Sequence, residues 1–428
     1  MKIYRIQMIT GLILFCFSVQ AEAQDRYKLE DCKRIAIENN RKLKNSRLEI
    51  QASEQLKKDA FTNFFPTISA SGTGILPKDP IVSMNMMGMQ LGLLEKGFQA
   101  GVTVTQPIFA GGRIINGNKL ASLGTEVNRF QAKLSENEVV LNTESMYWQL
   151  VSLYEKNRTL DIIDTQLDTL LKDVELAYKT GLITLNDVLK VKLKKNEVKS
   201  ARINLDNGIK LLKMSLCQQM NIDLDKADHF EIVIPDIEQV ESPAVYYVDH
   251  KTALAERMES KLLDKSVEAA KLQTKMKQGE YLPTIAIGAT YYGENIINKW
   301  RENSMAFASV SVPISGWWGG SHTIKRQRIQ EQIAVNTKND TEEKLLLQMQ
   351  NVKNQLDDAY KQILLAKDGV EQATENLRLN NNYYKVGTVT LTDVLDAQTL
   401  VQQNRDKYVE SYADYQKKHI EYLQVTGR

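Results

Sequence analysis

Apolar residues recur at alternating steps of three and four along two long stretches of the chain. The later series comprises Leu345, Met349, Val352, Leu356, Ala359, Ile363, Ala366, Val370, Ala373 and Leu377. The earlier series comprises Leu160, Ile163, Leu167, Leu170, Val174 and Ala177. A narrow apolar stripe with a period of about 3.5 residues is typical of a coiled coil rather than a globular helix. Residues 115–180 contain no proline, so we expect a helix there of about 65 residues, on the order of 100 Å long.

The chain also contains an internal repeat. Residues 178–189 return as residues 384–395, with eight of twelve positions identical at an offset of 206. Two pairs of prolines match as well, Pro107 with Pro313 at the same offset and Pro66 with Pro283 at an offset of 217. The first copy therefore has 11 extra residues between its prolines, whereas the length from the second proline to the repeated motif is constant. A constant length is what a rigid rod requires.

Each copy of the repeated Tyr-Lys-x-Gly motif predicts a turn between two antiparallel helices. Gly181 and Gly387 lie where a left-handed residue is expected at the end of a helix. After the first turn a second apolar series follows, at Val188, Val191, Val198, Leu205, Ile209, Leu212 and Leu216. We interpret residues 221–249, with two prolines and a short β-like run, as the irregular junction of the two repeats.

Between the paired prolines the apolar period changes to two. Residues 98–106 and 306–314 alternate apolar with small or polar side chains, and residues 66–73 and 283–292 supply two further strands. These strands of roughly ten residues have the length that a tilted strand needs to cross a bilayer. Aromatic residues cluster about the strand ends, as in an interfacial belt: Tyr291, Tyr292, Trp300, Trp317 and Trp318. A soluble sheet with exposed edges gives a similar pattern.

Four strands are too few to cross a membrane alone. Backbone groups in lipid need hydrogen-bond partners, so a spanning sheet must close on itself, and single-chain barrels begin at eight strands. Two copies would supply eight strands and three would supply twelve. The residues leave that number open but exclude a monomer.

The first residues indicate export. Residues 1–23 combine basic Lys2 and Arg5, a short apolar run and an Ala-x-Ala ending, which together predict a cleaved signal peptide. Lysine and arginine (55) nearly balance aspartate and glutamate (53), so nucleic acid is not expected as a partner. Cys32 and Cys217 could form a disulfide in an oxidising compartment, although two buried small side chains are the favoured interpretation.

Signals for catalysis and metal binding are weak. The four histidines are scattered, no His-Glu-x-x-His or zinc spacing occurs, and no phosphate-binding lysine motif is present. Residues 223–228 approach a calcium loop but lack its glycine and closing acid. We therefore expect no enzyme activity, cofactor or metal, and any transport must be powered by a partner.

Taken together, the repeat, the junctions at residues 106–113 and 312–320 and the motif at residues 386–397 resemble TolC-type outer-membrane efflux proteins. The resemblance covers essentially the whole mature chain. It implies a homotrimer with twelve strands in the outer-membrane lipid above a twelve-helix periplasmic tunnel. It also implies docking to a periplasmic adaptor and an inner-membrane transporter of the RND or ABC type.

The resemblance further implies roles for individual residues. Asp393 and Asp396 match acidic rings at the periplasmic entrance, where three copies of a carboxylate would favour cations. Asp187 and Tyr384 match a hydrogen-bonded network that closes this entrance. Gly181, Leu182, Gly387 and Thr388 match the tips that dock the adaptor. Val389 stands where some members have arginine, so the closing network here is expected to differ. The acids near the helix starts also have a simpler interpretation, stabilisation of the helix dipole.

The sequence thus predicts a mainly α protein of long coiled-coil helices with a small transmembrane β-part of two hairpins. The expected segments are the signal peptide 1–23, N-terminal helices 24–64, first β-hairpin 65–109, first helical hairpin 114–216, equatorial region 217–252, a helix at 253–281, second β-hairpin 282–314, second helical hairpin 321–424 and a C-terminal tail 425–428. The predicted function is passive export through the bacterial outer membrane. A non-conducting periplasmic coiled-coil scaffold is the alternative.

Overall fold

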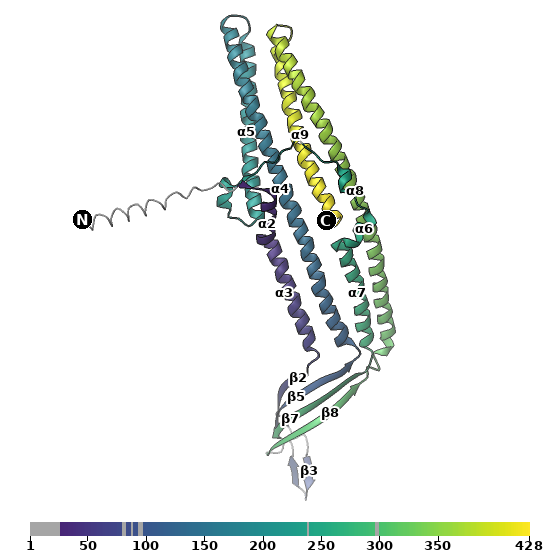
Figure 1. Cartoon of the computed structure of the whole chain (residues 1–428). Coiled ribbons are helices and arrows are strands. Elements are labelled where there is room, and N and C mark those ends of the chain that lie inside the picture. The colour runs from purple at the N-terminus through teal and green to yellow at the C-terminus, as the bar shows by residue number, and fades with distance from the viewer. Residues whose placement is uncertain (1–25, 79–82, 87–88, 93–96, 238, 296–298) are drawn as a thin grey trace, which may run out of the picture.

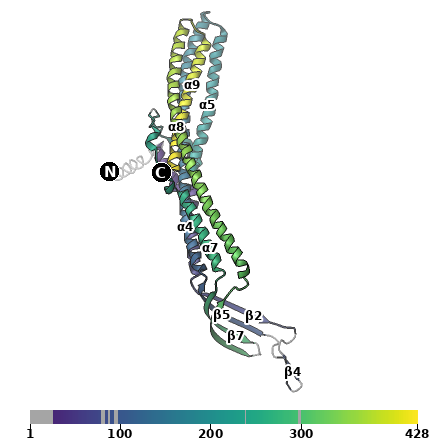
Figure 2. The same ribbon diagram turned by 90° about the vertical axis from the view of Figure 1, so that its right-hand side faces the viewer.

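The computed structural model describes residues 26–78, 83–86, 89–92, 97–237, 239–295 and 299–428. The chain is elongated, with helices running side by side from a β-sheet at one end to two helical tips at the other, and the C-terminus lies near the middle (Figures 1 and 2). The expected signal peptide lies outside the described residues. The predicted class, mainly α with a small β-part, is confirmed.

Two helices run through most of the length of the molecule. Helix α4 spans Arg113–Lys179 (67 residues) and α8 spans Trp317–Lys385 (69 residues). At 1.5 Å per residue each is about 100 Å long. A short turn leads from each into a return helix of 35 residues, α5 (Leu185–Gln219) and α9 (Leu391–Val425). The equal return helices reflect the repeat found in the sequence.

Apolar seams hold each helical hairpin together, as the 3.5-residue period predicts. Between α4 and α5, Leu167 and Val191 are fully buried within one apolar cluster. Between α8 and α9, Met349 and Leu356 are equally buried. Burial of each such side chain contributes about 1.5–3 kcal/mol relative to exposure. The two hairpins are therefore coiled coils.

Different short helices pack beside α4 and α8 in the two halves of the molecule. In the half next to the sheet, α3 (Arg41–Thr62) packs on α4, and α7 (Met258–Gly279) packs between α4 and α8. In the half next to the tips, α5 packs on α4, and α9 packs between α4 and α8. The helical wall consequently has the order α3-α4-α7-α8 near the sheet and α5-α4-α9-α8 near the tips.

Short elements surround the middle of the molecule. Strand β1 (Arg26–Tyr27) pairs in parallel with β6 (Glu231–Ile232). The remaining short elements are helices: α2 (Leu29–Asn39), η1 (Leu224–His229), η2 (Pro243–Tyr246) and α6 (His250–Glu256). They cover the point at which the short helices exchange, so the expected irregular junction has a packed core of its own.

Cys32 and Cys217 belong to this equatorial core. Both are completely buried and both are free thiols. Burial raises the pKa of the Cys32 thiol to about 12, which keeps it protonated and unreactive. They act as small buried side chains, the interpretation favoured from the sequence.

One antiparallel sheet closes the other end of the molecule. Its strand order is β2 (Thr67–Ile75), β5 (Gly97–Ala110), β7 (Thr284–Asn295) and β8 (Trp300–Ser311). The two predicted hairpins thus lie edge to edge, because β5 of the first pairs with β7 of the second along almost its whole length.

The structure adds two features to the expected strands. The longer first copy contains a second small hairpin, β3 (Ser83–Met86) with β4 (Met89–Gly92). In addition, β5 continues past the expected end at Gln106 to Ala110, with a register shift between Pro107 and Phe109. Proline lacks an N–H donor and is tolerated in a strand at such an irregularity.

Candidate functional site

The two helical tips are built on the predicted glycine turns. Gly181 and Gly387 have φ angles of 75° and 77°, in the left-handed region that costs other residues about 1–2 kcal/mol. The Gly181 N–H donates to the Tyr178 carbonyl and the Leu182 N–H to the Ala177 carbonyl, both at 2.9 Å. The turn at Gly387 and Thr388 has the same pattern of backbone bonds. Each turn therefore caps its long helix and reverses the chain.

The acids just after these turns cap the return helices. The Thr390 N–H and hydroxyl both donate to Asp393 Oδ2 at 2.7 Å, and Thr184 makes the corresponding bonds to Asp187 Oδ2 at 3.4 and 2.9 Å. These are reciprocal capping boxes. Hydrogen bonds from Thr390 lower the pKa of Asp393, so this carboxylate is charged at neutral pH. Both acids thus lie in the first turn of a return helix, where the simpler interpretation places them, and Asp393 carries a negative charge at the tip.

Asp396 occupies a different position from Asp393. It lies one turn further along α9, and its side chain is exposed to solvent. It is not part of the capping box. Asp396 therefore presents a charge at the tip whose removal leaves the helix cap intact.

Tyr384 lies near enough to Asp187 to feel its charge, but within the described residues no hydrogen bond joins the two side chains. Tyr384 is half-buried and packs against apolar clusters of both hairpins. Burial raises the pKa of its hydroxyl, and the nearby charges of Asp187 and Asp173 raise it further. The tyrosine thus lies where the two hairpins meet, with acids of the first hairpin beside it.

Lys190 is a tip residue that the sequence analysis missed. Its Nζ donates to Thr392 Oγ1 on α9 at 3.0 Å and lies 3.7 Å from Asp187 Oδ1 on its own helix. It therefore links the first hairpin to the second. The spacing of three from Asp187 was a visible signal for the ion pair, whereas nothing in the sequence indicated Thr392.

Further from the tips, α4 meets α9 through polar as well as apolar side chains, among the latter Trp148 and Tyr412, whose ring centroids are 5.7 Å apart. Gln398 Nε2 donates to Gln166 Oε1 at 3.2 Å, while its own Oε1 is buried without a hydrogen-bond partner among the described residues. Lys156 pairs with Glu410. Burial raises the pKa of the neighbouring Asp406 to about 6, with Lys156 opposing and Glu410 adding to the shift. The joint between the hairpins thus contains buried polar and charged groups in addition to apolar contacts.

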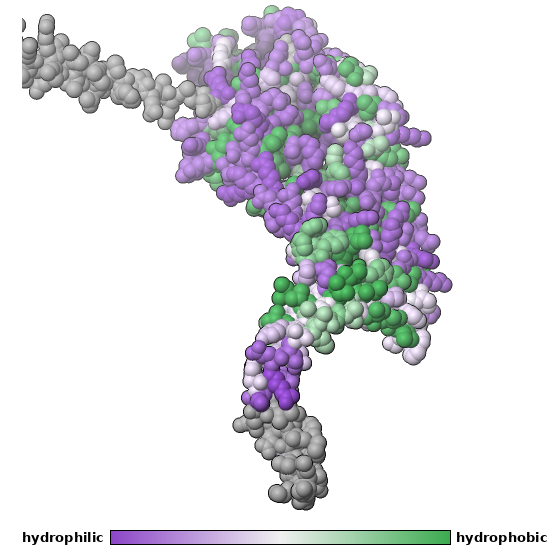
Figure 3. All heavy atoms as spheres, turned by 60° about the horizontal axis from the view of Figure 1, so that its bottom comes forward, coloured by the Kyte–Doolittle hydropathy of each residue, from purple (hydrophilic) through white to green (hydrophobic). Residues whose placement is uncertain are grey.

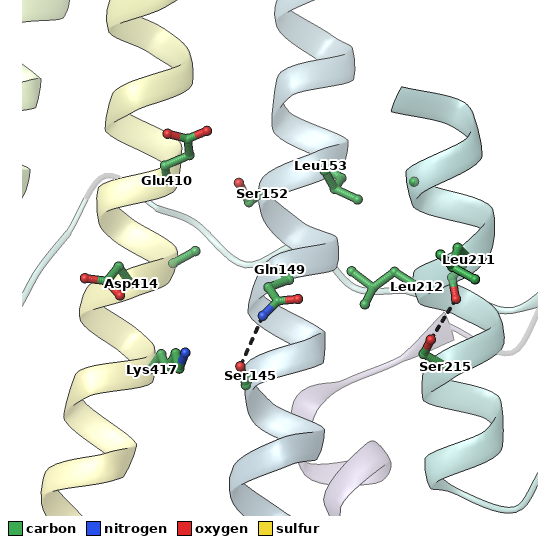
Figure 4. A pocket seen from close by; sticks show the side chains of 12 residues that line it. Ser145, Gln149, Ser152, Leu153, Leu211, Leu212, Ser215, Glu410, Asp414 and Lys417 are labelled. Atoms are coloured by element: carbon green, nitrogen blue, oxygen red, sulfur yellow. Dashed lines mark hydrogen bonds between the residues drawn. The ribbon is translucent and has the colours of Figure 1, made fainter. Parts of the chain in front are cut away.

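A groove of about 480 Å³ opens beside this joint near the equator (Figure 4). Side chains from α4, α5 and α9 face it, among them Gln149, Leu212 and Lys417. Its hydroxyls make local bonds: Ser145 Oγ accepts from Gln149 Nε2 at 3.3 Å, and Ser215 donates to the Leu211 carbonyl at 2.9 Å. Both serine side chains are thus engaged within their own helices.

The sheet has one apolar and one polar face. By register, the apolar face carries Ile68, Ala70, Val102, Val104, Ile287, Ala289, Ala306, Ala308 and Val310. The opposite face carries Thr67, Ser69, Ser71, Thr73, Thr103, Thr105, Thr290 and Ser309, together with the larger Tyr292, Met305 and Phe307. Thr103 and Thr290 are hydrogen bonded across it at 2.9 Å. Such alternation is typical of strands with lipid on one side and water on the other.

The predicted aromatic residues lie at two levels of the sheet. Tyr291 and Trp300, both about half exposed, lie at the end remote from the helices. Their polar atoms donate to Glu302 at 2.6 and 3.1 Å. Trp317 and Trp318, the latter 82% exposed, lie where the sheet joins α8. Hydrophobic residues gather on the sheet and at this junction, whereas the helical body is mostly hydrophilic (Figure 3).

The described residues, 26–78, 83–86, 89–92, 97–237, 239–295 and 299–428, offer neither a metal site nor a membrane-spanning helix. Within those ranges no cluster of histidine, cysteine, aspartate and glutamate is suited to hold a metal ion. None of the helices resolved there combines the length and the apolar character needed to cross a membrane.

Comparison with known proteins gives both a family and a fold. Residues 251–428 match the family model of the outer membrane efflux protein. The outer membrane protein VceC from Vibrio cholerae is 16% identical over 93% of this chain and 96% of its own, with a TM-score of 0.78. The CmeC outer membrane channel of Campylobacter jejuni is 13% identical over 93% and 85%, with a TM-score of 0.80. The MtrE outer membrane channel of Neisseria gonorrhoeae, solved in an open state, is 12% identical over 93% and 88%, with a TM-score of 0.73. A search of curated proteins found no match.

These similarities are to channels and efflux proteins rather than enzymes. At such low identity the solved structures establish the fold, and the family match adds the relation in sequence. The TolC-type resemblance is confirmed: residues 251–428 carry the sequence pattern of the outer membrane efflux protein family, and the chain as a whole has the fold of the solved outer-membrane channels.

Proposed function

We propose that the chain is the passive outer-membrane duct of a tripartite efflux or type I secretion system. The sheet carries this proposal. It has an apolar face, and its outer strands β2 and β8 each lack a partner on one side within the described part of the chain. In lipid these free N–H and C=O groups must be paired. Sister copies of the chain are the natural source of partners.

The strand directions allow such copies to close a barrel. All neighbouring strands are antiparallel, so β2 and β8 run in opposite directions. β8 of one copy can therefore pair in the antiparallel sense with β2 of the next, and the operation repeats around an axis. Three copies give twelve strands and a twelve-helix wall at each level, the arrangement that the family resemblance favours.

The tips are the proposed contact with the periplasmic adaptor. Gly181, Leu182, Gly387 and Thr388 form the two turns, and Leu182 is 79% exposed. An apolar side chain held out at a rigid turn is suited to packing against another protein. The adaptor would connect the duct to an RND or ABC-type transporter in the inner membrane, which supplies the energy.

The periplasmic entrance is the proposed point of control. Asp393 and Asp396 would form two rings of three carboxylates each in a trimer, which favours cations over anions. Asp187, Tyr384 and Lys190 lie where the hairpins of one chain meet, so they are placed to hold the entrance closed. Lys190 supplies a cation at this joint, where it contacts Thr392 in the first turn of α9.

The proposal is tested with the purified full-length protein. We expect a trimer by native mass spectrometry, recovery in the outer-membrane fraction and ion conductance in planar bilayers. A soluble protein that never conducts would refute the duct and favour the periplasmic scaffold instead.

A further inference from the structure

The four helices next to the sheet carry an unusual set of basic side chains. Eight of them are exposed and, within the part of the chain that the structure describes, form no salt bridge. They are Lys57 and Lys58 on α3, Lys119 on α4, Lys271 and Lys275 on α7, and Lys325, Arg326 and Arg328 on α8. We call this set the basic collar.

The collar is a local property of the sheet-proximal end. Residues 55–62, 113–122, 271–281 and 317–330 contain ten lysines and arginines against two acids, whereas the whole chain has a net charge of only +2. A few turns further from the sheet, basic side chains are paired between helices. Lys265 on α7 lies 2.8 Å from Glu126 on α4, and Lys338 on α8 pairs with Asp264 on α7. The absence of such partners in the collar leaves its charge available to another molecule.

The collar lies directly beside exposed aromatic side chains. Phe61 and Phe65 are more than half exposed at the end of α3, and Trp317 and Trp318 are exposed at the start of α8. At 1.5 Å per residue, residues 325–328 begin roughly 12 Å along α8 from Trp317. The interfacial layer on each side of a bilayer is about 5–8 Å deep, and lysine and arginine can extend their charged ends along a surface toward it.

We propose that the basic collar binds the phosphate groups of anionic phospholipids in the periplasmic leaflet of the outer membrane. The inference rests on the membrane insertion of the sheet that underlies the proposed function. Aromatic side chains enter the interface and basic ones above them meet anionic headgroups, an arrangement in which each cation adds to the attraction. Repetition around an oligomer surrounds the barrel with these charges. The collar thereby fixes the depth of the barrel and selects its lipid neighbours.

The test measures lipid selection by the full-length oligomer. The protein is exchanged into mixed micelles of phosphatidylglycerol and phosphatidylethanolamine at a ratio of 1:3. Bound lipids are then counted by native mass spectrometry. We expect phosphatidylglycerol to be enriched several-fold over the mixture, and we expect added salt to reduce the enrichment because charge screening weakens it.

Three variants separate charge from folding. Replacing Lys325, Arg326 and Arg328 by glutamine should remove at least half of the enrichment. Exchanging lysine and arginine at the same positions should retain it. A matched control that removes three exposed, unpaired lysines far from the sheet should leave it unchanged: Lys367→Gln, Lys407→Gln and Lys417→Gln.

Several outcomes would overturn the inference. The wild type would overturn it by binding the two lipids in the ratio of the mixture. It would also be overturned if the collar variant and the distal control lost the same share of phosphatidylglycerol enrichment. If the collar variant changed ion selectivity but not lipid composition, the basic residues would line the conduction path instead. If the wild-type protein forms conducting trimers but does not enrich phosphatidylglycerol, only the lipid site is refuted. If the wild-type protein forms no trimers and does not conduct, the proposed duct is refuted.

Discussion

Lys190 joins the two helical hairpins near their tips, and its removal tests whether that joint holds the entrance closed. Its Nζ is 3.0 Å from Thr392 Oγ1 on the second hairpin and 3.7 Å from Asp187 Oδ1 on the first. The lysine side chain is 38% exposed, so solvent screens the ion pair strongly. We therefore assign about 1 kcal/mol to the two contacts together.

A trimer contains this joint three times. Loss of about 3 kcal/mol changes the ratio of open to closed entrances by roughly 100-fold, because each 1.4 kcal/mol corresponds to a factor of ten. Lys190→Ala should therefore raise the open probability of single channels in planar bilayers by up to that factor. Trimer yield should not change, because the apolar seams within the hairpins are untouched.

Lys192→Ala is the matched control. Lys192 lies on the same helix and pairs with Glu175 at 3.0 Å, but this pair stays within the first hairpin. Its removal takes away the same charge without touching the joint, so open probability should stay near the wild-type value. Lys190→Arg should also remain largely closed. If the two alanine variants opened the channel equally, a general charge effect would explain the result. The role of Lys190 in holding the two hairpins together would then be refuted.

The other predictions concern the tips, the entrance charge and the joint. Gly387→Val and Gly181→Val force a β-branched residue into a left-handed turn, so efflux in whole cells should fail while trimers still assemble; normal efflux by both would count against tip docking. Asp396→Asn together with Asp393→Asn should raise chloride permeability, seen as a shifted reversal potential under a salt gradient, and an unmoved potential would remove the acidic-ring assignment. The raised pKa of Asp406, about 6, means that the folded state binds this proton more tightly than the unfolded chain, so stability falls as the pH rises from about 4 to 6. Asp406→Asn should therefore increase the melting temperature at pH 7.5 but not at pH 4, and equal effects at both pH values would contradict the assignment.

Much of the fold was predictable because it depends on local periodicity. The seam of α8 and the turn at Gly387 each follow from residues close together in sequence. The internal repeat supported these predictions further, because a helix or turn expected in one half could be compared with its counterpart in the other. The capping role of Asp393 was also readable, because threonine followed three residues later by an acid is a known capping pattern.

The remaining features depend on pairing between distant residues. Strands β1 and β6 are two residues long, so neither has a pattern of its own, and they pair across about 200 residues. The extra length of the first copy was visible, but not that it folds as the hairpin β3–β4. The expected strand ended at Gln106, and a local shift in register between Pro107 and Phe109 allows it to continue to Ala110.

The contrast between seams and joint suggests how such a structure can open without unfolding. Leucines and valines such as Leu167 interlock within each hairpin, and separating them would expose apolar surface at a large cost. The hairpins meet through a mixture of contacts: apolar ones, such as Leu391 with the cluster of the first hairpin and Tyr412 with Trp148, and polar ones, such as Gln398 with Gln166. Polar groups of this kind can exchange their bonds for water at little net cost. The buried Oε1 of Gln398 would gain a partner on exposure. Because part of the joint between α4 and α9 is polar, relative movement of two intact hairpins should cost less than separating the helices of either hairpin.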